Sequence, residues 1–66
     1  MAGTVLRLQA SAVAVQDAVP RALAVGEPIF VGDVLSTGKG ARLEVRMIDG
    51  AVMTLGERTS FVIIDY

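Results

Sequence analysis

The feature that most constrains the fold of this 66-residue chain is an alternation of apolar and polar residues with a period of two. In the clearest segment, 41–48, charged residues occupy the even positions from Arg42 to Arg46 and apolar residues occupy the odd positions from Leu43 to Met47. Because successive side chains of a β-strand point to opposite faces, this pattern predicts a strand with one buried face. Similar alternation, or a short apolar run, occurs at 4–9, 10–16, 21–25, 51–55 and 60–64.

Turn-forming residues separate these segments at intervals of about 8 to 12 residues, which is the spacing of an all-β sandwich or barrel. They are Gly26, Gly32, Asp33, Gly38, Gly40, Asp49, Gly50 and Gly56. The alanine-rich stretch 10–24 favours strands over one continuous helix because it contains β-branched valines and Pro20. We therefore predict one all-β domain over 1–66. It is expected to be a small roll, barrel or sandwich of about six or seven short, mainly antiparallel strands.

Asp49-Gly50, between two apolar segments, is the strongest turn signal in the chain. Both residue types tolerate positive φ, so the pair predicts a two-residue type I′ hairpin. The predicted pairs are Ile48 with Ala51, Met47 with Val52, Arg46 with Met53, Val45 with Thr54 and Glu44 with Leu55. In this register Ile48, Met53 and Leu55 share a face with the charged residues. We expect that face to be covered by the rest of a closed roll or by a partner chain.

The predicted core consists of the apolar side chains on one face of each predicted strand. Its members are Leu6, Leu8, Val13, Val15, Leu23, Val25, Phe30, Val34, Leu43, Val45, Met47, Val52, Phe61 and Ile63. Arg42, Glu44 and Arg46 are interpreted as a solvated strand face with cross-strand charge pairs. Recognition of an acidic partner by these three residues is the alternative.

Composition excludes several classes of function. The chain has no Cys and no His, which excludes a disulfide and argues against a structural zinc site. Its net charge is −1, its basic residues are scattered, and its aromatic residues are Phe30, Phe61 and Tyr66 only. These properties argue against nucleic-acid binding. No apolar run approaches the roughly 20 residues of a membrane span, and the first residues lack the features of a signal peptide.

No residue pattern indicates catalysis. Asp33 and Asp49 are candidates for a carboxylate pair, but each stands beside a glycine and is interpreted as a turn residue. The segment 38–40, Gly-Lys-Gly, lacks the residue order of a phosphate-binding loop. The acidic residues stand singly in separate turns instead of forming a calcium-binding cluster. We predict a protein that is not an enzyme and that binds no cofactor or metal.

The order of these signals from residue 3 to about residue 64 resembles the FecR domain family of bacterial extracytoplasmic proteins. The segments that carry the resemblance are GTV at 3–5, VAV at 13–15, LAVG at 23–26, VGDVLSTG at 31–38, GARLEV at 40–45, DGA at 49–51 and TLG at 54–56. The family's domain usually runs longer, so this chain is expected to be its core. The resemblance implies a β-rich module at the periplasmic side or the surface of a bacterial cell.

Members of that family relay an iron-uptake signal to a sigma factor. The same pattern also resembles the N-terminal retention modules of type I-secreted adhesins, which hold or anchor a protein. We therefore expect a non-enzymatic structural or interaction module. A cell-envelope sensor or ligand-binding domain and an adhesin retention module remain the alternatives. The expected partners are a second copy of the chain, an envelope protein or a glycan.

Self-association is expected because a chain of 66 residues that is 53% hydrophobic lacks disulfide or metal cross-links. The run 61–64, Phe-Val-Ile-Ile, is continuously apolar, and its strand is expected to offer an open edge to another copy. The residues predicted to contribute are Ile48, Met53, Leu55, Phe61 and Ile63. A closed monomer in which these side chains pack internally is the competing hypothesis.

The hairpin assignment leads to a first testable prediction. Gly50→Val should lower the free energy of unfolding by more than about 1 kcal/mol, because a β-branched residue resists positive φ. A thermal or denaturant melt measures this change. An unchanged melt would contradict a positive φ at Gly50 and with it the turn at Asp49-Gly50.

Overall fold

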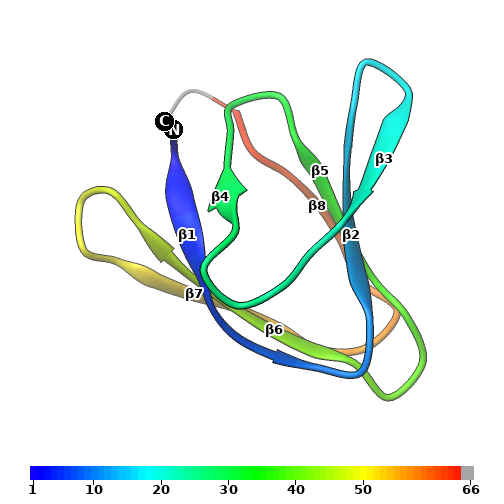
Figure 1. The fold of residues 1–66 in the computed structure, drawn as a ribbon. Coiled ribbons are helices and arrows are strands. Elements are labelled where there is room, and N and C mark those ends of the chain that lie inside the picture. Colours follow the sequence, from blue (N-terminus) through cyan, green and yellow to red (C-terminus); the bar gives the residue numbers. More distant parts are fainter. Residues whose placement is uncertain (65–66) are drawn as a thin grey trace.

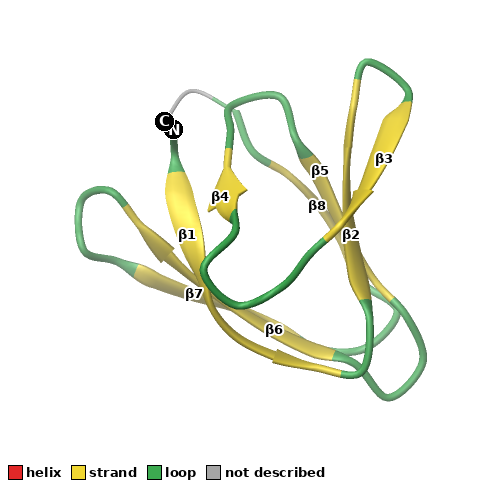
Figure 2. Ribbon diagram, viewed as in Figure 1, coloured by secondary structure: helices red, strands yellow, loops and turns green. Residues whose placement is uncertain are grey.

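The computed structural model, which describes residues 1–64, is a sandwich of two four-stranded sheets. The strands are β1 (Gly3–Gln9), β2 (Ala12–Gln16), β3 (Val19–Ala22), β4 (Pro28–Ile29), β5 (Val34–Thr37), β6 (Arg42–Met47), β7 (Val52–Leu55) and β8 (Ser60–Val62). One sheet has the order β4-β1-β6-β7 and the other the order β3-β2-β5-β8 (Figure 1). Figure 2 shows strands and loops and no helix among these residues. The predicted all-β class is confirmed, with eight strands instead of six or seven.

All neighbouring strands described in the two sheets pair in antiparallel orientation. The chain changes sheet between β1 and β2, between β3 and β4, between β4 and β5, between β5 and β6, and again between β7 and β8. Because of these crossings, each sheet is assembled from segments that are separated in the sequence by strands of the other sheet. Residues from both sheets contribute to one apolar core.

The β6–β7 hairpin differs from the predicted register by one residue. The observed pairs are Arg46 with Val52, Val45 with Met53, Glu44 with Thr54 and Leu43 with Leu55. The Met47 N–H donates to the Ala51 carbonyl at 2.7 Å, and the Gly50 N–H donates to the Met47 carbonyl at 2.9 Å. The loop therefore has three residues, and Gly50 alone within it has a positive φ, 91°. Positive φ at Gly50 is confirmed, whereas the two-residue type I′ turn is wrong; a type I turn followed by a left-handed glycine fits the geometry.

This one-residue shift changes which side chains reach the core. Met53 and Leu55 now lie on the same face as Leu43 and Val45, while Val52 joins the charged residues on the outer face. The hairpin thus has one apolar face and one largely polar face. The second apolar face that the predicted register required does not exist.

The core consists of small and medium-sized apolar residues. Its members are Ala2, Val5, Ala12, Ala14, Leu23, Ile29, Leu35, Leu43, Val45, Met47, Leu55 and Ile63. Five of the predicted core residues are among them, namely Leu23, Leu43, Val45, Met47 and Ile63. Five others are exposed and were wrongly predicted, namely Leu6, Val25, Phe30, Val52 and Phe61. Leu8, Val13, Val15 and Val34 are half-buried.

The error at Leu6 has a local cause. Val5 pairs with Val45 and Arg7 pairs with Glu44, so the register shifts between Val5 and Arg7. A bulge of this kind adds one residue to the strand and reverses the direction of the following side chains. As a result Leu8 faces the core on the same side as Val5, and Leu6 no longer shares the phase of Leu8 and is exposed.

Gly3 provides a prediction for the packing of β1 on β6. A Cβ atom at Gly3 would lie 2.7 Å from the Arg46 carbonyl oxygen and 3.2 Å from the Met47 Cα. Gly3→Ala should therefore destabilise the fold by about 1–3 kcal/mol through overpacking. Gly56→Ala is the matched control, because nothing lies within 4 Å of its added Cβ, and its effect should stay within about 0.5 kcal/mol. Equal urea midpoints for the two variants would contradict the close packing of β1 on β6.

Candidate interaction site

Asp33 is the most deeply buried polar side chain among the described residues, with an exposed fraction of 0%. It ends the turn 30–33, in which its own N–H donates to the Phe30 carbonyl at 3.1 Å. Its Oδ1 accepts a hydrogen bond from Gln16 Nε2 at 2.9 Å. Its Oδ2 accepts from the Phe30 N–H at 2.9 Å and from Arg21 Nη2 at 3.1 Å. Asp33 therefore joins β2, β3 and the loop that leads into β5.

Arg21 extends this network to the other sheet. Its Nη2 also donates to the Pro28 carbonyl of β4 at 2.8 Å, and its guanidinium carbon lies 5.4 Å from the centroid of the Phe30 ring. Gln16 Nε2 donates in addition to the Val31 carbonyl at 3.1 Å. Both oxygens of the Asp33 carboxylate accept hydrogen bonds from the protein itself. The Asp33 carboxylate is therefore enclosed by the protein, and Arg21 connects it to a strand of the other sheet.

The other predicted turn residues lie in separate loops. Positive φ occurs at Gly26, Gly32, Gly40 and Gly50 but not at Gly38 or Gly56. Asp49, in the β6–β7 loop, accepts a hydrogen bond from the Ala51 N–H at 3.0 Å through its Oδ1. The structure does not bring Asp49 to the Asp33 network. Within residues 1–64 no cluster of three or more acidic, His or Cys side chains has the arrangement of a metal site.

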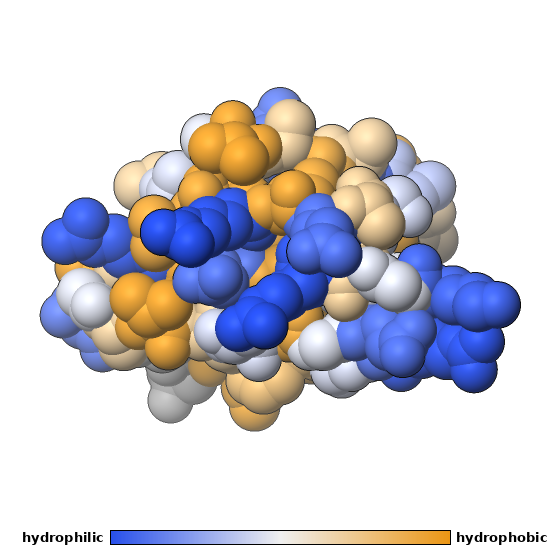
Figure 3. Space-filling view, turned by 90° about the horizontal axis from the view of Figure 1, so that it is seen from below, coloured by the Kyte–Doolittle hydropathy of each residue, from blue (hydrophilic) through white to orange (hydrophobic). Residues whose placement is uncertain are grey.

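The outer face of the sheet β4-β1-β6-β7 carries a group of arginines, which we call the arginine face: Arg7, Arg42 and Arg46. All three are exposed, and Glu44 lies among them with its Oε2 at 3.9 Å from Arg42 Nε. Viewed from below the orientation of Figure 1, the surface shows hydrophilic side chains between apolar ones (Figure 3). The arginine face therefore carries more positive than negative charge.

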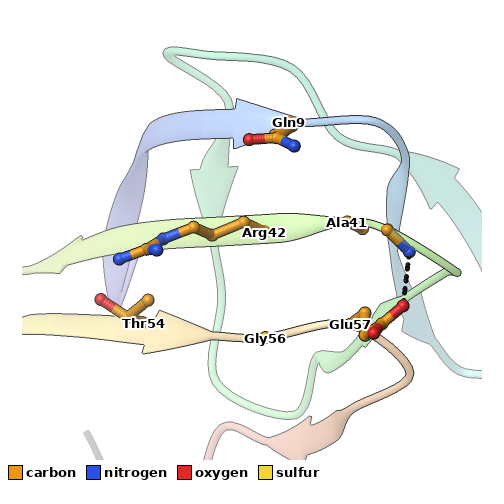
Figure 4. Close-up of a pocket in the computed structure, with 7 residues that line it drawn as sticks. Gln9, Ala41, Arg42, Thr54, Gly56 and Glu57 are labelled. Atoms are coloured by element: carbon orange, nitrogen blue, oxygen red, sulfur yellow. Dashed lines mark hydrogen bonds between the residues drawn. The ribbon is translucent and has the colours of Figure 1, made fainter.

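A hollow of about 480 Å³ adjoins the arginine face at the open end of the β6–β7 hairpin, where β6 begins and β7 ends. Gln9, Arg42, Thr54 and Glu57 line it (Figure 4). Glu57 Oε1 accepts a hydrogen bond from the Gly40 N–H at 2.8 Å, so part of this acid is used to fix the loop. The lining combines both signs of charge and includes no nucleophile paired with a base.

The outer face of the sheet β3-β2-β5-β8 has a different chemistry. Cross-strand pairing places on it Val13, Val15, Pro20, Ala22, Val34, Ser36, Ser60 and Val62. None of these residues is ionisable, and we call this surface the neutral face. The two outer faces of the sandwich therefore differ in charge: the arginine face is charged and the neutral face is not.

An apolar cavity of about 290 Å³ opens between the β6–β7 hairpin and β8, and we call it the β7–β8 cleft. It is lined by Met47, Ala51, Met53, Phe61, Val62, Ile63 and Ile64. Of the residues predicted to mediate self-association, Met53, Phe61 and Ile63 line this cleft. Leu55 and Ile63 are only 3% and 1% exposed, so their side chains belong to the core, and Ile48 is exposed in the hairpin loop.

Val62 and Ile64 were not among the candidate contact residues, although they are 47% and 72% exposed. The continuous apolar run 61–64 was the available signal for them. In a strand, successive side chains point to opposite faces, so a run of this kind always places apolar groups on both. The sequence-based prediction included Phe61 and Ile63, which share one strand face, and omitted Val62 and Ile64 on the other.

The Asp33 network leads to a prediction about stability. Asp33→Asn should destabilise the fold by about 1–3 kcal/mol, because the amide donates where a buried carboxylate oxygen accepts. Asp17→Asn is the matched control; Asp17 is exposed in a turn with φ 50°, a conformation that Asn tolerates well. Denaturant melts should separate the two variants. An unchanged free energy of unfolding for Asp33→Asn would show that the network contributes little to stability.

Comparison with known proteins gives one informative match. No family model matches the chain, and neither does any curated protein. A solved structure described as "Cell surface anchoring domain" is similar over 97% of this chain and 86% of its own, with a TM-score of 0.91 and 25% sequence identity. No helix among the described residues is long and apolar enough to cross a membrane. The chain thus has the β-sandwich architecture of a cell surface anchoring domain.

Proposed function

We propose that this chain is a non-enzymatic module that anchors a bacterial protein at the cell surface by binding other macromolecules. The observation that carries the proposal is the structural likeness to a cell surface anchoring domain over almost the whole chain. The sequence pattern that resembles adhesin retention modules agrees with it. Both point to the periplasm or the cell surface as the place of action.

The side-chain chemistry supports binding over catalysis. The two acidic residues considered for acid–base chemistry lie in different loops, and Asp33 is enclosed by Gln16, Arg21 and Phe30. Two hollows adjoin the arginine face, and each is lined by side chains of both signs of charge. Such surfaces recognise another molecule by charge and shape. The module therefore works by contact, with an envelope protein or glycan as the partner.

The FecR-like sequence pattern favours a second candidate function, that of an envelope domain in an iron-uptake-type signalling protein. Anchoring and signalling use the same kind of module and differ in what the module is attached to. We include self-association in the proposal for either role, because exposed apolar residues are numerous for a chain of this size. Its physical basis is the burial of these residues between two copies.

Retention at the cell surface is the measurement that tests this function. The chain is fused to a reporter that a type I secretion system exports from a bacterium with two membranes. The fused reporter should remain in the envelope fraction, whereas the reporter alone is released into the medium. A fusion to an unrelated β-sandwich of similar size is the control for folding and bulk. Release of the fusion to the same extent as this control would contradict the proposed function.

A further inference from the structure

Four strands form the edges of the two sheets within the described chain: β3, β4, β7 and β8. Natural proteins protect such edges with proline, charge or short length, because a free edge pairs with other strands. β3 contains Pro20 and Arg21, and β4 has two residues and begins with Pro28. β8 and the residues after it to Ile64 contain neither a charge nor a proline.

β7 likewise contains neither a charge nor a proline, but its neighbours differ from those of β8. Its outward-facing Val52 and Thr54 lie opposite Arg46 and Glu44. The corresponding residues of β8, Ser60 and Val62, lie opposite Ser36 and Val34 on the neutral face. The outer face beside the β7 edge is thus charged one strand away, whereas the outer face beside the β8 edge is uncharged. β8 is the unprotected edge.

The backbone of β8 is used on one side only. The Thr37 N–H donates to the Thr59 carbonyl at 2.9 Å, and the Ile63 N–H donates to the Asp33 carbonyl at 2.8 Å. Because hydrogen bonding in an antiparallel pair involves alternate residues, Ser60, Val62 and Ile64 direct their N–H and C=O groups away from β5. No other strand of residues 1–64 lies on that side.

We propose that β8 is the docking site for a second copy of this chain, whose own β8 pairs with it in antiparallel orientation. The proposal rests on the self-association part of the proposed function and is independent of anchoring. An antiparallel pair of identical strands has two-fold symmetry, so each copy offers the same surface. A second copy fits here because its β8 segment is extended, uncharged and free on the matching side. The two four-stranded sheets would join into one sheet of about eight strands.

The register follows from the backbone directions. Centring the two-fold axis on Val62 places it opposite Val62 of the second copy and places Ser60 opposite Ile64 of the second copy. This is the arrangement in which all three outward-facing residues find a partner, with up to about six backbone hydrogen bonds. Phe61 then lies opposite Ile63 of the second copy, beside the apolar β7–β8 cleft. Both free β8 edges are covered, so association ends at the dimer.

Sedimentation equilibrium over a wide concentration range tests the proposal with the variant Val62→Lys. Val62 is 47% exposed, so lysine is accommodated in the monomer while it places two like charges on the two-fold axis. The dissociation constant of the dimer should rise by about tenfold or more. Val62→Thr, which keeps the shape and the strand preference, is the matched control. Val52→Lys makes the same change on the β7 edge and should leave the dissociation constant unchanged.

Charge reversal tests the register itself. Val62→Lys and Val62→Glu should each be largely monomeric, and an equimolar mixture should regain a dimer mass because lysine then faces glutamate. If Val62→Lys lowers the melting temperature too far, a mixture of Ile64→Lys with Ser60→Glu replaces the pair, since Ile64 is 72% exposed and faces Ser60 of the second copy in this register. Failure of the mixture to dimerise, or equal weakening by Val52→Lys, would overturn β8 pairing.

The wild-type chain and the reporter fusion separate this inference from anchoring. A wild-type chain that stays monomeric at high micromolar concentration overturns the proposal, even if its fusion is retained in the envelope. If the wild-type chain is a monomer and Val62→Lys lowers its melting temperature, the β8 edge is covered within the same chain. That outcome also overturns the proposal. Dimerisation lost in Val62→Lys together with normal retention supports β8 pairing and shows that anchoring does not require it.

Discussion

The carboxylate of Asp33 holds together segments that lie far apart in the sequence, with hydrogen bonds from Gln16, Arg21 and Phe30. Arg21 of β3 bonds both to it and to the Pro28 carbonyl of β4, so one guanidinium links an edge strand of each sheet. β3 and β4 are short and lie on either side of a crossing between the sheets. Hydrogen bonds to charged groups contribute about 1.5–3 kcal/mol each when they are well formed. The Arg21 side chain is 31% exposed, so solvent screening weakens its electrostatic attraction to Asp33. Its hydrogen bonds still fix the position of β3 relative to β4.

The sandwich that this network stabilises presents its charges unequally. Three of the six basic residues lie on the arginine face, and the opposite neutral face has none. Sheet pairing produces this separation, since each strand directs alternate residues outward and neighbouring strands share the same phase. A charged partner and a second copy can therefore occupy different sides of one small domain without competing for the same residues.

The fold class followed from the alternation of residues and the spacing of turns, whereas register depended on details that alternation does not contain. At Asp49-Gly50 the pair predicted a turn and a left-handed Gly50, both of which occur. The bond from the Ala51 N–H to the Asp49 side chain accompanies a loop of three residues instead of two. One residue of difference moved Met53 and Leu55 to the core face, because side chains alternate with a period of two. The bulge between Val5 and Arg7 had the same effect on β1.

The core also shows why composition predicts how much apolar surface needs covering but not where it lies. Ala12 and Ala14 point inward on β2, and the larger Val13 and Val15 point outward onto the neutral face. Gln16 continues the inward phase of the alanines, and a polar residue on a buried phase requires a buried partner, which Asp33 supplies. The position of Gln16 on the same strand face as Ala12 and Ala14 was thus the sequence signal that could have indicated the Asp33 network. Since alanines fill part of the interior, the surplus of larger apolar side chains remains on the neutral face and along β8, where another molecule can cover it.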